Sequence, residues 1–158
     1  MNPEMHEVCI VVGSDIDPVG NTREALKQLR LQVEVSAISP TWETESFGSP
    51  GPNYLNTAVL CHSPLSAEEL KQLLRSIEEK LGRVRTSDKN APRTIDLDII
   101  IYEEKLIEPK LWERLFLAMP VSGLLPDFME PETGLKLYQV AQKLLEKGWA
   151  KPHPELNL

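Results

Sequence analysis

The residues best suited to chemistry are two aspartates, Asp96 and Asp98, which follow a strongly basic stretch. Four cations precede them within eleven residues, namely Arg83, Arg85, Lys89 and Arg93. The chain as a whole has a formal net charge of −7, so this basic cluster is a local exception. Cationic side chains bind phosphate oxygens, and carboxylates bind hard divalent cations. The stretch is therefore suited to a small polyanion held together with metal ions.

The two aspartates are expected to lie on one face of a strand over residues 95–102, because they are two positions apart. Their side chains then lie about 7 Å apart, with Leu97 pointing into the core. At this distance two ionised carboxylates repel each other by about 2 kcal/mol at an effective dielectric of about 20. Water, an arginine or a bound cation must offset this repulsion. The spacing alone leaves two interpretations open: carboxylates that hold Mg²⁺ for phosphate transfer, or a strand that begins at solvent with Arg93 paired to Asp96.

The elements before this stretch read as a scaffold. The β-branched run at 8–12 predicts a buried strand, and the residues from Gly13 to Asp15 end it. That end is either a plain turn or a place where the backbone approaches a phosphate. Asn21 is a candidate N-cap for a helix, with Glu24 three residues on, and the alternation over 33–37 predicts a second strand. Residues 40–53 contain three prolines and two glycines, which predicts a long irregular loop.

A strand over residues 54–60 places Tyr54 and Asn56 on the same face. An aromatic ring and an amide on one face can stack on a flat heterocycle and read its hydrogen-bonding edge. The alternative is an aromatic ring packed on the sheet beside a solvated amide. The spacing does not decide between them.

The most secure element is a helix that begins at the capping box of Ser66 and Glu69 and ends before Gly82. Its apolar stripe consists of Leu70, Leu73, Leu74, Ile77 and Leu81. Glu78 lies on the flank of that stripe and is expected to face the basic loop, where Arg83 or Arg85 would compensate its charge or Glu78 would accept a hydrogen bond from a ligand. Residues 133–147 predict a last helix.

The bulk composition limits the class of protein. A length of 158 residues predicts one domain over residues 1–158, and the pI near 5.0 argues against nucleic acid as the main partner. No apolar run is long enough to span a bilayer, and the first residues lack the features of a signal peptide. Cys9 and Cys61 lie in apolar runs, where reduced, buried thiols are expected. We therefore expect a cytoplasmic monomer that does not bind membranes.

Several sequence blocks together resemble the 6-hydroxymethyl-7,8-dihydropterin pyrophosphokinase family of folate biosynthesis. The longest is APRTIDLDII at residues 91–100, preceded by GRVR at 82–85. Four shorter blocks match in order: Gly13-Ser14, YLNTAV at 54–59, Ile77-Glu78 and Leu125-Pro126-Asp127. The resemblance covers nearly the whole chain.

The resemblance implies an α+β, ferredoxin-like domain with helices packed on a mainly antiparallel sheet. It implies transfer of the pyrophosphoryl group of ATP to the hydroxymethyl group of the pterin, with release of AMP. By similarity, Asp96 and Asp98 would hold two Mg²⁺ ions. The implied ATP contacts are Glu78, Arg83, Arg85, Arg93 and Arg114, of which Arg83 and Arg93 would also act in catalysis. The implied pterin contacts are Thr44, Tyr54, Asn56 and Phe116.

The chain differs from the family pattern at two places. Asn90 stands where the family usually has a tryptophan in its arginine-rich loop. The segment before Arg114 and Phe116 is several residues shorter and lacks a Pro-His pair. The shortened segment leaves one alternative open, a relative that binds pterin or nucleotide without turnover. The fold class leaves a second, which is a different two-metal enzyme such as a nucleotidyltransferase.

Overall fold

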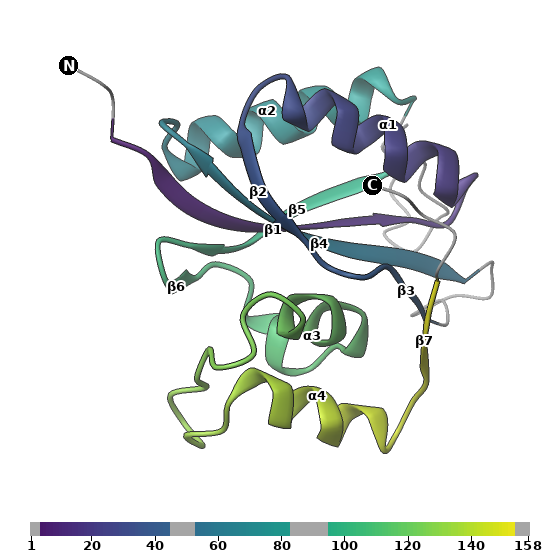
Figure 1. The fold of residues 1–158 in the computed structure, drawn as a ribbon, viewed down its shortest axis with the longest axis vertical. Helices are drawn as coiled ribbons and strands as arrows, with labels where there is room; N and C mark the ends of the chain where they lie inside the picture. Colours follow the sequence, from purple (N-terminus) through teal and green to yellow (C-terminus); the bar gives the residue numbers. More distant parts are fainter. Residues whose placement is uncertain (1–3, 45–52, 83–94, 154–158) are drawn as a thin grey trace, which may run out of the picture.

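A seven-stranded antiparallel sheet separates two layers of helices (Figure 1). The computed structural model describes residues 4–44, 53–82 and 95–153. The elements in chain order are β1 (His6–Ser14), α1 (Pro18–Arg30), β2 (Glu34–Ile38), β3 (Trp42–Thr44), β4 (Tyr54–Ser63), α2 (Ala67–Lys80), β5 (Asp96–Tyr102), β6 (Lys105–Leu106), the 3₁₀ helix η1 (Pro109–Trp112), α3 (Leu115–Ser122), α4 (Leu137–Leu145) and β7 (Ala150–Pro152).

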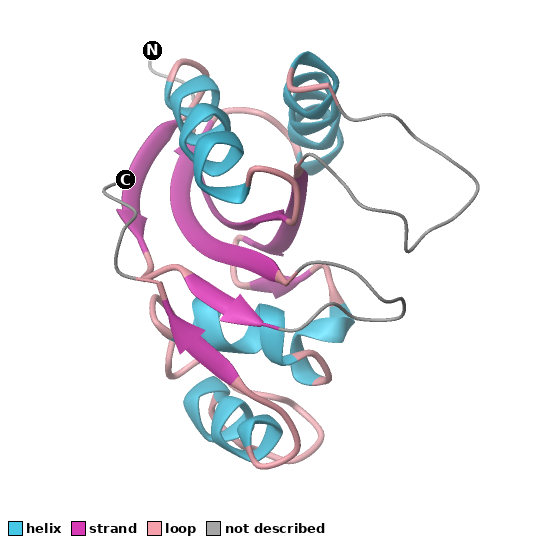
Figure 2. Cartoon of the chain, turned by 90° about the vertical axis from the view of Figure 1, so that its right-hand side faces the viewer, coloured by secondary structure: helices cyan, strands magenta, loops and turns pink. Residues whose placement is uncertain are grey.

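The sheet has the strand order β6-β5-β1-β4-β3-β7, and β2 also pairs with β4. All of these pairings are antiparallel. The strands β5, β1, β4 and β2, joined through α1 and α2, form the ferredoxin-like part of the fold. Figure 2 shows α1 and α2 on one side of the twisted sheet and α3 and α4 on the other. The predicted α+β, ferredoxin-like class is confirmed.

Each face of the sheet has its own core, because successive residues of a strand point to opposite faces. On the side of α1 and α2, alternate residues of β1 such as Val8, Ile10 and Val12 are buried against apolar residues of both helices. On the side of α3 and α4, Cys9 and Val11 are buried instead. Cys61 lies in the first core and Cys9 in the second, and both are free thiols. The expectation of reduced, buried cysteines is confirmed.

Helix α2 begins as the sequence predicts. Ser66 accepts a hydrogen bond from the backbone N–H of Glu69, and the Glu69 carboxylate accepts one from the N–H of Ser66. Leu70, Leu74 and Ile77 are buried. Gly82 follows the helix with a φ of 86°, a left-handed conformation that favours glycine.

Helix α1 begins earlier than predicted. It starts at Pro18, whose fixed φ suits the first helical position, and the N-cap is Asp17. Asn21 lies inside the helix, where its side-chain amide donates to the carbonyl of Ile16. The prediction of Asn21 as N-cap is therefore wrong, because the proline takes precedence.

Three further predictions need correction. The segment expected to be irregular over 40–53 contains strand β3, which pairs with β4. Helix α4 covers only Leu137–Leu145 of the predicted 133–147, because the chain before it forms a turn closed by a bridge between Met129 and Lys136. The sequence did not predict helix α3. Its residues are apolar in almost every position, so no helical stripe marks it.

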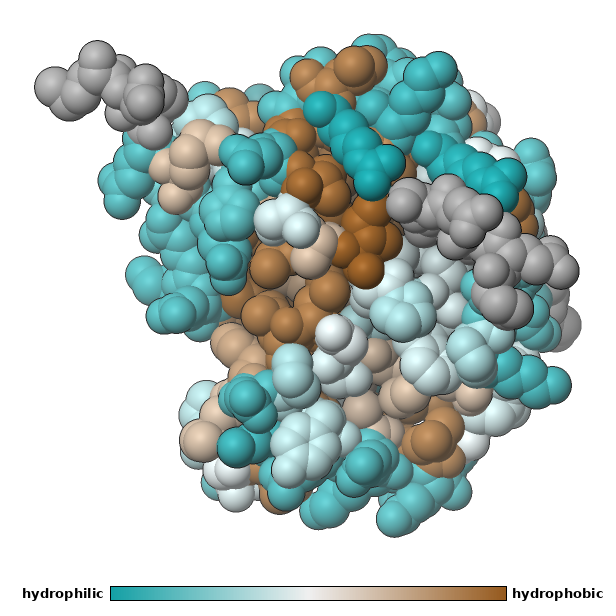
Figure 3. All heavy atoms as spheres, viewed as in Figure 1, coloured by the Kyte–Doolittle hydropathy of each residue, from teal (hydrophilic) through white to brown (hydrophobic). Residues whose placement is uncertain are grey.

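Apolar side chains gather on the face where β2 crosses in front of the sheet (Figure 3). The partly buried residues of this edge include Val35 and Ile38. Strand β2 lies at the opposite side of the four central strands from β5, so this surface is separate from the edge that carries the aspartates. Among the described residues, no helix is both long and apolar enough to cross a membrane.

Candidate active site

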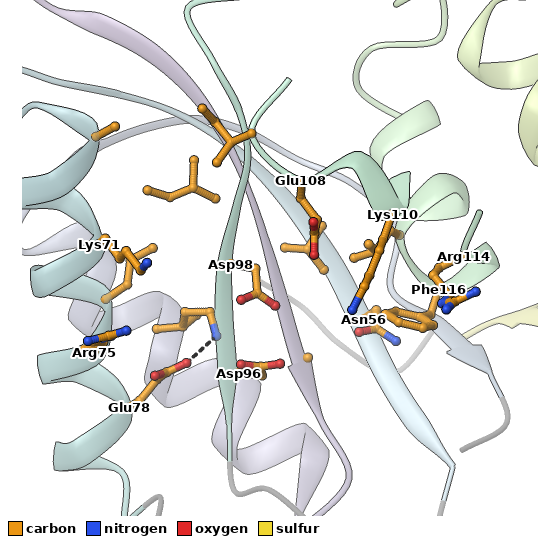
Figure 4. A pocket seen from close by; sticks show the side chains of 18 of the residues that line it. Asn56, Lys71, Arg75, Glu78, Asp96, Asp98, Glu108, Lys110, Arg114 and Phe116 are labelled. Carbon is orange, nitrogen blue, oxygen red and sulfur yellow. Dashed lines mark hydrogen bonds between the residues drawn. The ribbon is translucent and has the colours of Figure 1, made fainter. Parts of the chain in front are cut away.

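A cleft of about 740 Å³ runs along β5. Helix α2 forms one wall, and the segment from η1 to the start of α3 forms the other, as Figure 4 shows. Strand β6 pairs only with Ile101 and Tyr102 at the far end of β5. Among the described strands, the Asp96 end of β5 is therefore an open edge, and the cleft lies along it.

Asp96 and Asp98 both line the middle of this cleft. Asp98 pairs in register with Val11, which belongs to the core under α3 and α4. Leu97 belongs to the opposite core. The prediction that the two carboxylates share one face while Leu97 points into the core is therefore confirmed.

The pKa of Asp98 is raised from 3.8 to about 8. Burial is the main cause, and the negative charges of Asp96 and Glu78 follow. A hydrogen bond with Asp96 and the charge of Glu108 raise the pKa further. The side chain is open to the cleft, yet protein surrounds it on its other sides. A group of carboxylates that holds one proton in this way attracts a cation that would replace the proton.

Glu78 contacts the strand between the two aspartates. Its Oε2 accepts a hydrogen bond of 2.8 Å from the backbone N–H of Leu97. The residue is 3% exposed, so this carboxylate is almost fully enclosed. The sequence predicted Glu78 on the flank of the apolar stripe of α2. It did not predict the contact of Glu78 with β5, because the two residues are 19 positions apart and no local pattern marks such a contact.

Tyr54, Asn56 and Phe116 line the end of the cleft away from α2. Figure 4 shows the side chains of Asn56 and Phe116 beyond the aspartates on that side. The amide nitrogen of Asn56 is buried and has no hydrogen-bond partner among the described residues. Because a buried donor without a partner costs about 1–3 kcal/mol, it is suited to a ligand. The shared face of Tyr54 and Asn56 is thus part of the cleft.

Thr44 lies on the neighbouring strand and pairs in register with Tyr54. It is buried, and its hydroxyl oxygen also has no partner within the described part of the chain. Thr44 does not line the cleft itself. The structure therefore brings Thr44 beside Tyr54, on the strand next to β4.

Gly13 lies within β1, between the strands that carry Asp96 and Asn56, and pairs in register with both. A Cβ at this position would lie 2.6 Å from Oδ1 of Asn56. The predicted turn is therefore wrong at Gly13, since strand β1 continues to Ser14. The glycine leaves the space that the Asn56 side chain occupies.

The predicted arginines divide into two groups. Arg114 lines the cleft, whereas Arg83, Arg85 and Arg93 lie outside the described residues. Five further charged residues of the cleft were not predicted as site residues: Lys71, Arg75, Glu68, Glu108 and Lys110. The spacing of Lys71, Arg75 and Glu78 on one helix face was the available signal for the first two.

The cleft can hold a metal-bound anion. Its described lining contains the five carboxylates of Glu68, Glu78, Asp96, Asp98 and Glu108. Among the described residues, however, no three or more His, Cys, Asp or Glu side chains are arranged so that they could hold a metal ion together. This arrangement suits Mg²⁺, which usually takes one or two carboxylates and completes its shell with water and substrate phosphates.

Comparisons with known proteins identify the family of the chain. The family model described as 7,8-dihydro-6-hydroxymethylpterin-pyrophosphokinase (HPPK) matches residues 9–126. The chain is 33% identical to a 2-amino-4-hydroxy-6-hydroxymethyldihydropteridine pyrophosphokinase of Synechocystis sp. over 152 residues, which covers 89% of this chain and 77% of that protein. It is 31% identical to a protein of the same name from Porphyromonas gingivalis over 121 residues, with coverages of 68% and 82%.

The fold is also similar to a solved structure. A Plasmodium falciparum HPPK-DHPS crystal structure with pterin and p-hydrobenzoate matches 92% of this chain with a TM-score of 0.74. At 8% identity this likeness concerns the fold alone, and the chain spans 45% of the length of that protein. The family match over most of the sequence, and not the fold, is decisive: the chain belongs to the 7,8-dihydro-6-hydroxymethylpterin-pyrophosphokinase family.

Proposed function

We propose that this protein transfers the pyrophosphoryl group of ATP to the hydroxymethyl group of 6-hydroxymethyl-7,8-dihydropterin, releases AMP and acts in folate biosynthesis. The observation that carries the proposal is the order of groups along one cleft. Asp96 and Asp98 lie in the middle, with Asn56 and Phe116 on one side and the cations of α2 on the other. Two substrates could bind there with their reacting atoms at the aspartates.

The pterin would bind at the end formed by Tyr54, Asn56 and Phe116. Aromatic rings favour offset stacking on flat heterocycles. The buried amide of Asn56 and the buried hydroxyl of Thr44 supply polar groups that need partners. A site built on such groups rejects a ligand that leaves them unpaired, which is a strong source of specificity.

Asp96 and Asp98 would hold Mg²⁺, and we propose two ions. When bound, the ions would neutralise the negative charge of the phosphates, including the charge that develops during transfer. Burial and the negative charges of Asp96 and Glu78 raise the pKa of Asp98, and this supports the assignment, because a bound cation would offset both effects.

In the proposed reaction, the pterin hydroxyl oxygen forms a bond to the β-phosphorus of ATP. The bond between that phosphorus and the oxygen bridging it to the α-phosphorus breaks, AMP leaves, and the hydroxyl proton passes to solvent. The residues of the chain act by alignment and charge neutralisation, which together supply most of the acceleration in such transfers. Arg83, Arg85, Arg93 and Arg114 are proposed to contact the phosphates.

The proposal includes a cytoplasmic monomer that acts on these two small molecules. The free thiols of Cys9 and Cys61 support a reducing compartment. Sedimentation of the purified protein would test the monomer.

One assay tests the function. The protein is incubated with ATP, Mg²⁺ and 6-hydroxymethyl-7,8-dihydropterin, and AMP and the pterin pyrophosphate are measured in parallel. We expect equal amounts of both products from wild type and none from Asp96→Ala or Asp98→Ala. Both variants should still fold, because the two aspartates lie on a polar face of the strand. Release of ADP in place of AMP, or pterin binding without AMP release, would overturn the proposed reaction. Retained activity in both variants would overturn the metal assignment.

A further inference from the structure

We infer that Lys71 and Arg75 on α2 bind the anionic AMP half of the nucleotide, with Arg75 toward the α-phosphate and Lys71 farther along the nucleotide. Both side chains line the cleft. The inference rests on the proposed function, because it uses ATP as the substrate.

Helix α2 is fixed against β5 at both of its ends. Near its last turn, Glu78 accepts the hydrogen bond from the Leu97 N–H. Just before its first turn, the carbonyl of Leu65 accepts a hydrogen bond of 2.7 Å from the Tyr102 hydroxyl. Since Leu97 lies near the start of β5 and Tyr102 at its end, the helix runs antiparallel along the strand. The positions of its side chains relative to the aspartates are therefore set by the fold.

The two cations follow Glu78 in regular steps along this helix. Arg75 and Lys71 precede Glu78 by three and seven residues, which corresponds to about 4.5 Å and 10 Å along the axis. All three residues share one helix face because of the i, i+3 and i+4 spacing. Leu74 and Ile77 on the adjoining face are buried, so the helix cannot rotate this face away from the cleft. Figure 4 shows Lys71, Arg75 and Glu78 along the α2 wall.

The order of groups in the cleft assigns these cations to the leaving half of the nucleotide. Asn56 and Phe116 lie on one side of the aspartates, and α2 lies on the other. If the pterin occupies the first side and the β-phosphorus lies at the aspartates, AMP must extend toward α2. Negative charge develops on AMP as the bond to the β-phosphorus breaks. A guanidinium group remains charged throughout and can bind phosphate oxygens in pairs, which suits Arg75 to this charge.

The charge of the cleft also favours this role. The cations of its described lining are Lys71, Arg75, Lys110 and Arg114. Arg114 lies on the opposite wall, near Phe116, and Lys110 lies on that wall as well. On the α2 side, the cleft is lined by Lys71 and Arg75, by Glu68 and Glu78 of the same helix, and by Asp96 and Asp98 of β5. Without these two cations, every described charge around the AMP end would be negative, and an anion would be repelled.

The test compares Lys71→Ala, Arg75→Ala and the double variant with wild type. Lys80→Ala is the matched control, because Lys80 is an exposed cation of the same helix that does not line the cleft. Calorimetry measures the Kd of Mg–ATP and of AMP, each without pterin, and the Kd of the pterin alone. We expect each single variant to bind both nucleotides about tenfold more weakly, Arg75→Ala the more so, with pterin binding and the control unchanged.

Loss of charge also has a second signature. The double variant should show a weaker dependence of nucleotide affinity on salt, because fewer ionic contacts are screened. Arg75→Lys, which keeps the charge but not the paired donors, should recover part of the affinity. Substitutions of exposed residues such as these usually change stability by less than about 0.5 kcal/mol, and thermal unfolding checks this.

The outcomes separate this inference from the proposed function. If the double variant binds Mg–ATP and AMP as tightly as wild type, or if wild type binds neither, the inference is overturned. If the variants lose nucleotide affinity but wild type releases no AMP with pterin present, the inference stands and the proposed reaction fails.

Discussion

The carboxylate of Glu78 accepts a 2.8 Å hydrogen bond from the backbone N–H of Leu97, the residue between Asp96 and Asp98. A helix side chain thus holds the strand at the point where the two candidate metal ligands project. The N–H lies at the edge of the sheet, where no described strand pairs with it. The contact therefore replaces a missing strand partner and connects α2 to the centre of the cleft.

We predict that Glu78→Ala lowers the free energy of unfolding by about 1–3 kcal/mol, because the N–H of Leu97 then lacks a partner in an enclosed site. Glu78→Gln keeps an acceptor of nearly the same shape and should cost less. Urea unfolding of the metal-free protein measures both changes. Glu79→Ala, an exposed neighbour on the same helix, is the control. Equal and negligible costs for the two Glu78 variants would show that the hydrogen bond contributes nothing.

Asp98 should make stability depend on pH. Its pKa is about 8 in the folded chain, against 3.8 for an aspartate with an unperturbed side chain. The folded state therefore binds more protons between these values, and the free energy of unfolding should fall as pH rises from about 4 to about 8. Because the side chain is open to the cleft, we expect a loss on the order of 1 kcal/mol after solvent screening.

Asp98→Asn removes this titration. Without metal, the variant should match wild type at a pH of about 4 and exceed it in stability at a pH above about 8, although it loses activity. Urea unfolding in the presence of a chelator measures the difference. A wild-type stability that does not fall relative to the variant over this range would contradict the prediction.

Mg²⁺ binding should be linked to the same proton. A carboxylate binds the ion in its ionised form, so the proton on Asp98 must leave. Metal affinity should rise with pH by at most about tenfold per unit until about pH 8 and then level off. Calorimetry with a non-hydrolysable ATP analogue, in buffers of different ionisation enthalpy, measures both the affinity and the protons released. An affinity that is independent of pH would exclude Asp98 as a ligand that must lose a proton.

Gly13→Ala should weaken pterin binding selectively. The new methyl group would lie 2.6 Å from Oδ1 of Asn56, so the amide must move. We expect about a tenfold increase in the Kd of the pterin, with the Kd of Mg–ATP unchanged. Gly148→Ala is the control, since its Cβ would make an ordinary contact of 3.4 Å with Leu115. An unchanged pterin Kd would mean that Asn56 does not contact the pterin or that it adjusts freely.

The parts of the fold that the sequence predicted are those with strong local signals. The capping box of Ser66 and Glu69 placed the start of α2, and the two-residue spacing of Asp96 and Asp98 placed both carboxylates on one face. Both signals depend on neighbours a few residues apart. The same period-two pattern identified the shared face of Tyr54 and Asn56.

The parts that were not predicted depend on contacts far apart in the sequence. Helix α3 has no polar face, because it is buried between the sheet and α4, and Pro120 lies inside it. The contact of Glu78 with Leu97 and the position of Arg75 along the cleft arise only when α2 packs on β5. The resemblance to known pyrophosphokinases supplied roles for residues but could not supply these distances.

The open edge of β5 has a further consequence for the behaviour of the protein in solution. An unpaired strand edge can add a strand from another molecule and so begin aggregation. Here the edge carries Asp96 and Asp98, and Glu78 occupies the N–H of Leu97 that a foreign strand would use. The carboxylates proposed for metal binding and the contact of Glu78 therefore also disfavour pairing of this edge with a foreign strand, as charged side chains do at other exposed sheet edges.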